Sequence, residues 1–407
     1  MDNLYLVAAA WIGLALIASL ISIRIGLSVA LIEIALGVLA GNAFGFQTNA
    51  WIDALAALGA ILLTFLAGAE IDPESLRRHF RKSVTIGVLS FAIPAAAAFL
   101  FAYLVAGWDL QAAEIAGIAL STTSVAVVYA VMIETRLATE EIGKLILAAC
   151  FVTDLGTVVA LGVLFADFDA LMLVFIAATV VLLIAGPRLL VRLRRYAPDR
   201  VSEPEVKWIL FVLLLLGGLA VSASSEAVLP AYLAGLAFAG TFQHDRVLVH
   251  RMRATAFSLL TPFYFIKAGL LVSLPAVANG VLLIAAFLGL KVGAKFAGVW
   301  PVSRGFGMSI RDANFTTLLM STGLTFGTIS ALFGLSHGYI DQSMYTILVT
   351  TVILSAVVPT LIATTFFEPR IRGDEEREEV DAAEEIDVGP LPRHPRVSDA
   401  VVEAPSP

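Results

Sequence analysis

The chain has 407 residues, of which 59% are hydrophobic and only 14% are charged. Soluble domains carry nearly twice that charged fraction, so the composition excludes an ordinary soluble fold and favours a protein that crosses a bilayer repeatedly. The single cysteine, Cys150, excludes an internal disulfide. The net charge is −7, and no basic face suggests binding to nucleic acid.

Residues 1–367 predict an all-α polytopic membrane domain of about thirteen transmembrane helices, because apolar runs of suitable length follow one another with short connections. The first run lacks a basic n-region and a cleavage site, so we expect a retained span and not a signal peptide. The expected spans are 4–23, 27–45, 51–70, 83–106, 113–133, 143–166, 170–193, 207–224, 227–243, 256–273, 277–300, 313–334 and 342–366.

Basic residues in the connecting loops alternate in agreement with this count. The loops after odd-numbered spans contain 18 Lys and Arg residues, and the loops after even-numbered spans contain none. The positive-inside rule places the basic loops in the cytoplasm. We therefore expect the amino terminus outside, the carboxyl terminus in the cytoplasm, and a location in the inner membrane of a prokaryotic cell.

The fifth and twelfth expected spans both carry hydroxyl-rich interruptions at mid-membrane depth. Hydroxyls compete with the backbone for hydrogen bonds, and glycine loosens a helix. These spans run in opposite directions, as the paired discontinuous helices of an inverted repeat do. The alternative is that small residues merely let the helices pack closely. The polar runs are Ser121, Thr122, Thr123 and Ser124 in the fifth span, and Ser321, Thr322, Gly323, Thr325, Gly327 and Thr328 in the twelfth.

Asp154 lies near the centre of the sixth span, between apolar turns. A charge at this depth is costly and usually functional, and an aspartate is too short to reach the membrane surface. We therefore expect Asp154 to face a cavity or a partner, where it can bind a proton or a metal cation. The alternative is a structural aspartate whose oxygens are satisfied by neighbouring hydroxyls.

Three lysines lie within the tenth and eleventh spans. Lys291 and Lys295 are four residues apart and share a helix face, and Lys295 is close enough to the cytoplasm to extend towards it. Lys267 lies deeper in the membrane. A buried lysine can pair with Asp154 or carry a second proton, and the spacing leaves open which lysine pairs. Glu33, in the second span, suits a packing or dimer contact as well as an ion path.

Residues 368–407 form a predicted acidic cytoplasmic tail. This segment contains 12 acidic and 5 basic residues, whereas residues 1–367 contain 21 of each. Clustered like charge and low apolar content predict disorder. The tail is short for a nucleotide-binding domain and has no glycine-rich fingerprint.

Five segments, in order along residues 1–366, carry a family resemblance: LLTFLAGAEIDPESLRR (62–78), GIALSTTSVAVV (117–128), ILAACFVTDLGTVV (146–159), TPFYFIKAGLLVSL (261–274) and LKVGAKFAGV (290–299). Together they resemble the monovalent cation:proton antiporters of the Kef/Nap branch, the cation:proton antiporter-2 family with its sodium/hydrogen exchanger domain. The resemblance implies a fold with two crossing discontinuous helices, a mobile core of about 83–166 and 277–366, dimerisation through the remaining helices, alternating access, and a homodimer.

The resemblance also implies roles for individual residues. Asp154 matches the ion-binding carboxylate, whereas Thr153 stands where electrogenic members have another aspartate, which favours one-for-one exchange. Lys295 matches the lysine that pairs with that aspartate, and Thr123 matches a cation-coordinating position. The expected ion site is Asp154, Thr153, Thr123 and Ser124, with Lys295, Lys267 and Glu70 as supporting charges.

The expected function is the exchange of Na+ or K+ for H+ across the bilayer, with both ions competing for Asp154. We expect no cofactor and no enzymatic activity, since the chain has no HExxH or GxSxG motif. A sodium-coupled symporter would need a pocket for an organic anion, which Lys267 or helix amino ends would bind. A channel would need a filter repeat, and none is present. The choice between Na+ and K+ and the charge balance remain open.

Overall fold

The computed structural model describes residues 4–25, 28–69, 78–137, 140–165, 170–196, 202–223 and 227–369, which are helical and contain no strand. Residues Met1–Glu368 form one compact unit. The helices are α1 (Leu4–Ile25), α2 (Val29–Phe44), α3 (Ala50–Ala69), α5 (Phe80–Leu104), α6 (Leu110–Ser121), α7 (Val125–Glu134), α8 (Glu141–Leu164), α9 (Ala170–Tyr196), α10 (Pro204–Ser222), α11 (Val228–His244), α12 (Arg246–Thr255), α13 (Thr261–Leu270), α14 (Leu274–Asn279), α15 (Val281–Gly305), α16 (Ile310–Met320), α17 (Thr325–Ser336) and α18 (Gln342–Phe366).

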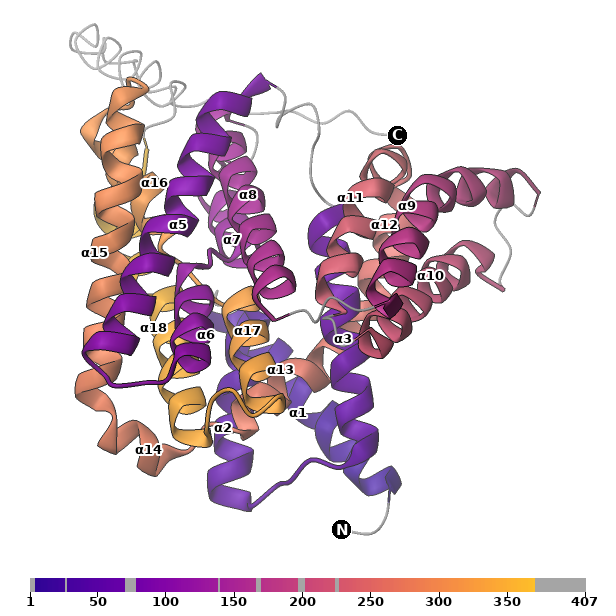
Figure 1. Ribbon diagram of the computed structural model, residues 1–407, viewed down its shortest axis with the longest axis horizontal. Helices are drawn as coiled ribbons and strands as arrows, with labels where there is room; N and C mark the ends of the chain where they lie inside the picture. The colour runs from indigo at the N-terminus through magenta and orange to yellow at the C-terminus, as the bar shows by residue number, and fades with distance from the viewer. Residues whose placement is uncertain are drawn as a thin grey trace, which may run out of the picture. The chain divides into compact units, whose positions relative to one another are not determined.

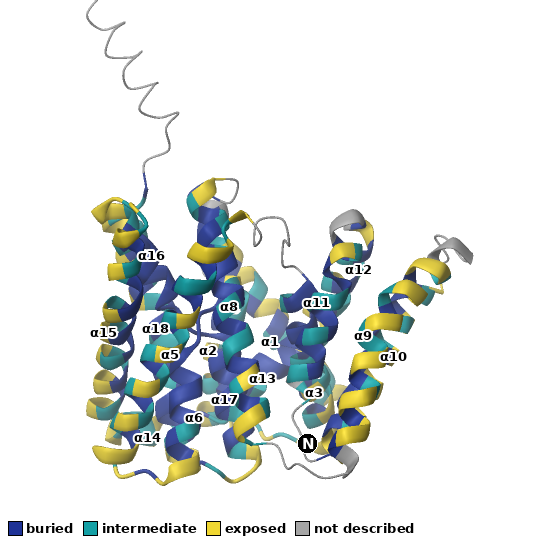
Figure 2. Ribbon diagram, turned by 45° about the horizontal axis from the view of Figure 1, so that its top comes forward, coloured by how far each residue is buried: buried dark blue, intermediate teal, exposed yellow. Residues whose placement is uncertain are grey.

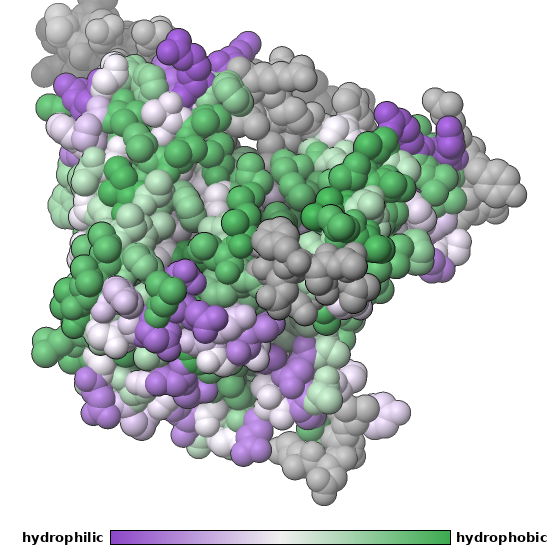
Figure 3. Space-filling model, in the orientation of Figure 1, coloured by the Kyte–Doolittle hydropathy of each residue, from purple (hydrophilic) through white to green (hydrophobic). Residues whose placement is uncertain are grey.

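Ten helical segments in the described ranges are long and apolar enough to cross a membrane, and α2 and most of α11 form two shorter apolar helices. The all-α membrane architecture is therefore confirmed, whereas the count of thirteen spans stays a prediction. Figure 3 shows apolar surface across the middle of the molecule, with more hydrophilic residues towards opposite ends. Such a band is what a bilayer-spanning protein presents to lipid.

The two predicted breaks divide the most buried segments of the protein. The spans Leu110–Met132 and Ile310–Ser336 are 78% and 89% buried over their apolar windows, compared with 22% for Met172–Leu193 in α9. Figure 2 shows the contrast between the buried interior around α6 and α17 and the exposed residues along α9. The discontinuous helices thus lie inside the bundle, where surrounding helices exclude lipid from their free backbone groups.

The helices pack in two groups (Figure 1). The first, called here the core group, contains α5 to α8 and α15 to α18; α5 packs on α6, α8 and α15, and α17 packs on α6 and α18. The second, the scaffold group, contains α1 to α3 and α9 to α13, with α3 packed on α11 and α13 packed on α2 and α3. The groups contact each other through α8 and α11, and α14, which connects α13 to α15, packs on α18.

Close backbone contact joins α2 to α13 in the scaffold group. A Cβ atom on Gly269 would lie 2.0 Å from the Ile34 carbonyl oxygen, and one on Gly37 would lie 2.2 Å from the Ile266 carbonyl oxygen. Only glycine permits such an approach, as at other small-residue interfaces between membrane helices. This contact holds together the scaffold helices that face the core group.

Helix α12 continues into α13 through a π-helical turn, Ala256–Leu260. Pro262, in the first turn of α13, has no N–H to donate to the preceding turn. A wider turn accommodates the missing bond, as π-helical turns do where a helix pattern is interrupted. The turn carries Phe257, which lines the cavity described below.

Candidate ion-binding site

The site is built on two helix breaks that bond directly to each other. Residues between α6 and α7 leave helical geometry at Thr122, whose φ and ψ are −62° and 153°. The backbone N–H of Ser124 donates to the Thr322 carbonyl at 3.0 Å, and the Thr123 hydroxyl donates to the Met320 carbonyl at 2.8 Å. The predicted interruptions of the fifth and twelfth spans therefore meet at one crossing.

Lys295 of α15 stabilises the first of these breaks. Its Nζ donates to Ser90 Oγ at 2.8 Å, to the Ser121 carbonyl at 2.7 Å and to Thr123 Oγ1 at 3.0 Å. An ammonium group has three N–H donors, so all of them are paired. Ser121 ends α6, and a positive charge there complements the free carbonyls of a helix carboxyl end.

Lys291, one turn away on α15, lies against the second break. Its side chain is 1% exposed, and its Nζ has no hydrogen-bond partner among the described residues. A Cβ atom on Gly323 would lie 2.2 Å from this Nζ, and 3.1 Å and 3.2 Å from the hydroxyl oxygens of Thr122 and Ser355. Gly323 therefore makes the room that the Lys291 side chain occupies at the crossing.

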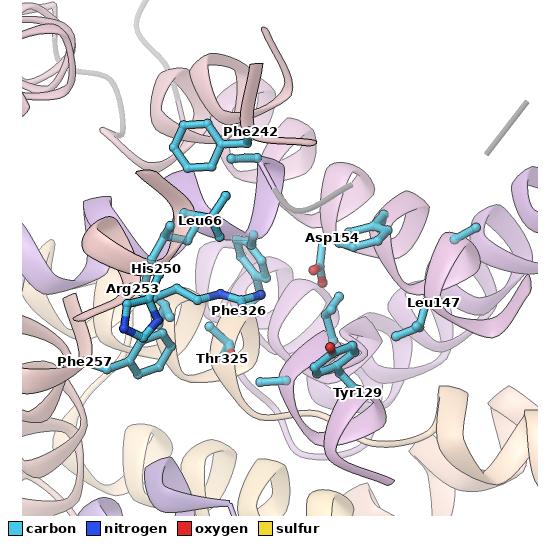
Figure 4. A pocket seen from close by; sticks show the side chains of 18 of the residues that line it. Leu66, Tyr129, Leu147, Asp154, Phe242, His250, Arg253, Phe257, Thr325 and Phe326 are labelled. Carbon is cyan, nitrogen blue, oxygen red and sulfur yellow. The ribbon is translucent and has the colours of Figure 1, made fainter. Parts of the chain in front are cut away.

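Asp154 of α8 lines a cavity of about 990 Å³. The residue is 1% exposed, and its Oδ1 has no hydrogen-bond partner within the described part of the chain. Thr325, the first residue of α17, lines the same cavity. Figure 4 shows the Asp154 carboxylate and Tyr129 on one side of this space and His250 and Arg253 on the facing side. A carboxylate oxygen without a donor is available to bind a proton or a cation.

The rest of the cavity wall is apolar and basic. Phe151, Phe242, Phe257 and Phe326 lie on it together with leucine side chains. In the described part of the chain, its chargeable residues besides Asp154 are Lys144, His250 and Arg253. Lys144 is in the first turn of α8, and α12 carries the other two, so the cavity reaches the end of the bundle where the predicted basic loops lie.

Several residues of the predicted site do not lie with Asp154 on the cavity wall. Thr153 Oγ1 donates to the Ala149 carbonyl at 3.1 Å and lies 3.3 Å from the Gly87 carbonyl, so this side chain faces α5. Ser124 Oγ accepts from the Val127 N–H at the start of α7. These hydroxyls are occupied with the protein's own backbone.

The predicted supporting charges are also separated. Lys267 forms an ion pair with Asp53 of α3 at 2.7 Å, with exposures of 16% and 45%. No ion pair found among the described residues joins Lys295 to Asp154. Glu70 lies outside the described residues. The predicted supporting charges therefore form no salt bridge with the aspartate in the described part of the chain.

Sequence reasoning did not find three features of the site. Tyr232 of α11 donates its hydroxyl to the Phe151 carbonyl at 3.0 Å and packs edge-on against Phe326. Ser90 supplies an acceptor to Lys295. Arg253 lines the cavity, whereas its sequence position indicates only that it belongs to a basic loop beside a span. The only signal for Tyr232 was a phenol in an apolar helix, which usually finds a hydrogen-bond partner when buried.

A bundle of apolar helices, two crossing discontinuous helices and a buried carboxylate on a one-sided cavity together define the class of secondary membrane transporters. The family model described as "Sodium/hydrogen exchanger, transmembrane" matches residues 12–368. The chain belongs to this sodium/hydrogen exchanger family. It is therefore a cation:proton antiporter by family and not an enzyme, which confirms the family resemblance.

Individual relatives agree with this placement. The chain is 24% identical to a "Probable Na(+)/H(+) antiporter 3" from Methanocaldococcus jannaschii, covering 78% of this chain and 84% of the relative. It is 25% identical to the "Na(+)/H(+)-K(+) antiporter GerN" from Bacillus cereus, covering 85% and 92%. The solved structure of the sodium proton antiporter MjNhaP1 from Methanocaldococcus jannaschii at pH 8 superposes with a TM-score of 0.68 at 15% identity, covering 90% of this chain and all of that one, and so confirms the predicted fold class.

Proposed function

We propose that the protein exchanges Na+ or K+ for H+ by letting the two ions compete for Asp154. The single observation that carries this proposal is the position of this carboxylate. Among the described residues, Asp154 is the one acidic residue that lines the cavity, and its Oδ1 has no hydrogen-bond donor. A site with one negative charge holds either one proton or one monovalent cation, so loading with one releases the other.

Neutral oxygens complete the proposed cation site. Thr325 lines the same cavity as Asp154, and carbonyl oxygens are present at the two breaks. Hydroxyl and carbonyl oxygens suit a hard monovalent ion, and the half-helix carboxyl ends at a crossing attract cations. We retain Thr123 and Ser124 as contributors through their backbone, because their hydroxyls are already hydrogen bonded.

The packing around Asp154 supports the proposal that it is reached from one end at a time. The cavity reaches the basic end of the bundle, whereas beyond Asp154 the two groups close in a buried apolar cluster. Val158, one turn further along α8, is 0% exposed, and Phe263 of the scaffold group belongs to the same buried cluster and is 1% exposed. We propose that the core group moves along the scaffold group and opens this seal to the other side.

Orientation, stoichiometry and assembly complete the proposal. The positive-inside rule places the cavity mouth in the cytoplasm, with the amino terminus outside. Thr153 offers no carboxylate to Lys295, which supports one-for-one exchange through Asp154. As the family resemblance implies, we propose a homodimer in which the scaffold groups meet.

The test is ion-driven pH change in proteoliposomes that contain the purified protein and a pH-sensitive dye inside. We expect Na+ or K+ to drive proton movement in wild type and Asp154→Asn to abolish it. Asp109→Asn is the matched control, because Asp109 caps α6 through the Ala112 N–H and asparagine caps equally well. If Asp154→Asn exchanges as fast as the control, the assignment of the site is wrong.

A further inference from the structure

Two buried tyrosines tie the core group to the scaffold group. Tyr232 of α11 donates its hydroxyl to the Phe151 carbonyl of α8 at 3.0 Å. Tyr345 of α18 donates to the Ala268 carbonyl of α13 at 2.8 Å. Both side chains are 0% exposed. Each bond therefore joins one group to the other where water does not compete for the donor.

The two bonds lie at different depths in the bundle. Tyr232 is in the second turn of α11, which starts at the end opposite Arg253, and Tyr345 is in the first turn of α18. The start of α18 lies near the end of α8, since Phe165 stacks on Tyr339 at 4.9 Å. The Tyr345 bond thus lies on the sealed side of Asp154, whereas the Tyr232 bond reaches the cavity wall, because its acceptor Phe151 precedes Asp154 on α8 and lines the cavity.

Tyr232 also acts directly on the wall that carries the ion site. Phe151 lies one turn before Asp154 on the same face of α8, and both residues line the cavity. The Tyr232 ring contacts Phe326, another wall residue, with centroids 6.0 Å apart. A displacement of α8 along α11 breaks this hydroxyl bond and separates these rings.

The two bonds differ in what their loss costs. The Phe151 carbonyl lies in the middle of α8 and has two lone pairs, so Tyr232 uses the lone pair that the helix leaves free. Ala268 is in the last turn of α13, where the Val272 N–H donates to the Gly269 carbonyl, so Tyr345 supplies a donor to a carbonyl at a helix end. Loss of the Tyr232 bond therefore leaves only the phenol in need of a new partner, which limits the cost of opening there.

We propose that Tyr232 and Tyr345 are positioning residues that hold Asp154 facing the cavity by bonding the core group to the scaffold group. This inference rests on the proposed alternating access of the core group. Replacement of either tyrosine by phenylalanine keeps the ring and removes the tie, so the sealed side opens more often. One hydrogen bond changes such an equilibrium by about two- to tenfold, and the two ties act in the same direction.

The experiment measures how often the seal opens. Val158→Cys, in a Cys150→Ala background, places a reporter thiol in the buried seal, and a membrane-impermeant maleimide is applied from the side opposite the cavity mouth. We expect Tyr232→Phe and Tyr345→Phe each to raise the labelling rate about two- to tenfold, and the double variant to raise it by roughly the product.

Trp300→Phe is the matched control. The Trp300 indole donates to Asn314 Oδ1 at 2.9 Å, and both residues belong to the core group, so this bond does not join the two groups. Unchanged labelling in both tyrosine variants, or an equal rise in Trp300→Phe, overturns the inference. Exchange by the same proteins is measured in parallel. Antiport that depends on Asp154 but not on the tyrosines contradicts only this inference, whereas antiport independent of Asp154 contradicts the proposed function.

Discussion

Lys295 and Lys291 provide a matched pair of substitutions, because they lie one turn apart on α15 and are 0% and 1% exposed. Lys295 has three hydrogen-bond acceptors, whereas Lys291 has no partner among the described residues. Methionine has a similar length and no charge. We therefore expect Lys295→Met to destabilise the protein and Lys291→Met to leave its stability unchanged or raised.

The magnitudes follow from these contacts. A hydrogen bond to a charged group contributes about 1.5–3 kcal/mol, but the desolvation of a buried ammonium, several kcal/mol, offsets most of that gain at Lys295. In Lys295→Met the Ser121 carbonyl loses its ammonium donor at a helix end, at a cost of about 1–3 kcal/mol. Lys291→Met removes a buried ammonium group that has no hydrogen-bond partner among the described residues, so it removes a desolvation cost of several kcal/mol without the loss of a bond.

The assay is thermal unfolding of the purified variants in one detergent, followed by loss of the monomer or dimer peak in size-exclusion chromatography. The expected order of Tm is Lys291→Met at or above wild type, with Lys295→Met lowest. Lys267→Met is a further control, since its partly exposed pair with Asp53 is expected to contribute less than about 1 kcal/mol. Equal losses in Lys295→Met and Lys291→Met would refute the reasoning.

Three further substitutions test the packing and the cavity. Gly323→Ala places a Cβ 2.2 Å from Lys291 Nζ and is expected to lower the free energy of unfolding by about 1–3 kcal/mol. Adding Lys291→Ala should restore part of this loss in a double-mutant cycle of Tm values. Additive effects of the two substitutions would contradict the contact. Gly269→Ala places a Cβ 2.0 Å from the Ile34 carbonyl, whose backbone cannot give way, so the variant is expected to be absent from the folded fraction on size-exclusion chromatography. Lys144→Gln removes a positive charge from the cavity wall and is expected to lower the KM for the cation from that side several-fold at low ionic strength, with no change at high salt.

The general architecture could be predicted from the residue types along each segment of the sequence. Apolar runs predicted a helical membrane protein, and hydroxyl and glycine residues predicted both helix breaks, because such residues weaken a helix wherever they occur. The depth of Asp154 in its span predicted a buried carboxylate, which the cavity places at the candidate site. Each of these features depends on position along one helix.

Features that depend on how a helix is rotated and on which helices lie next to it could not be predicted from the sequence. Thr153 is adjacent to Asp154 but faces α5, because successive helix residues point about 100° apart. Lys267 was a candidate partner for Asp154, yet its nearest carboxylate is Asp53, far away in sequence. The tie from Tyr232 to Phe151 likewise depends on which helices pack together.

Proton release on cation binding tests the central claim most directly. Purified protein in weakly buffered detergent is titrated with NaCl or KCl, with choline chloride as the control, while a dye reports pH and calorimetry reports binding. The account predicts about one proton released per cation bound from protein that starts protonated, and no release from Asp154→Asn that remains folded. Cation binding without proton release, or equal release from Asp154→Asn, would contradict competition at Asp154.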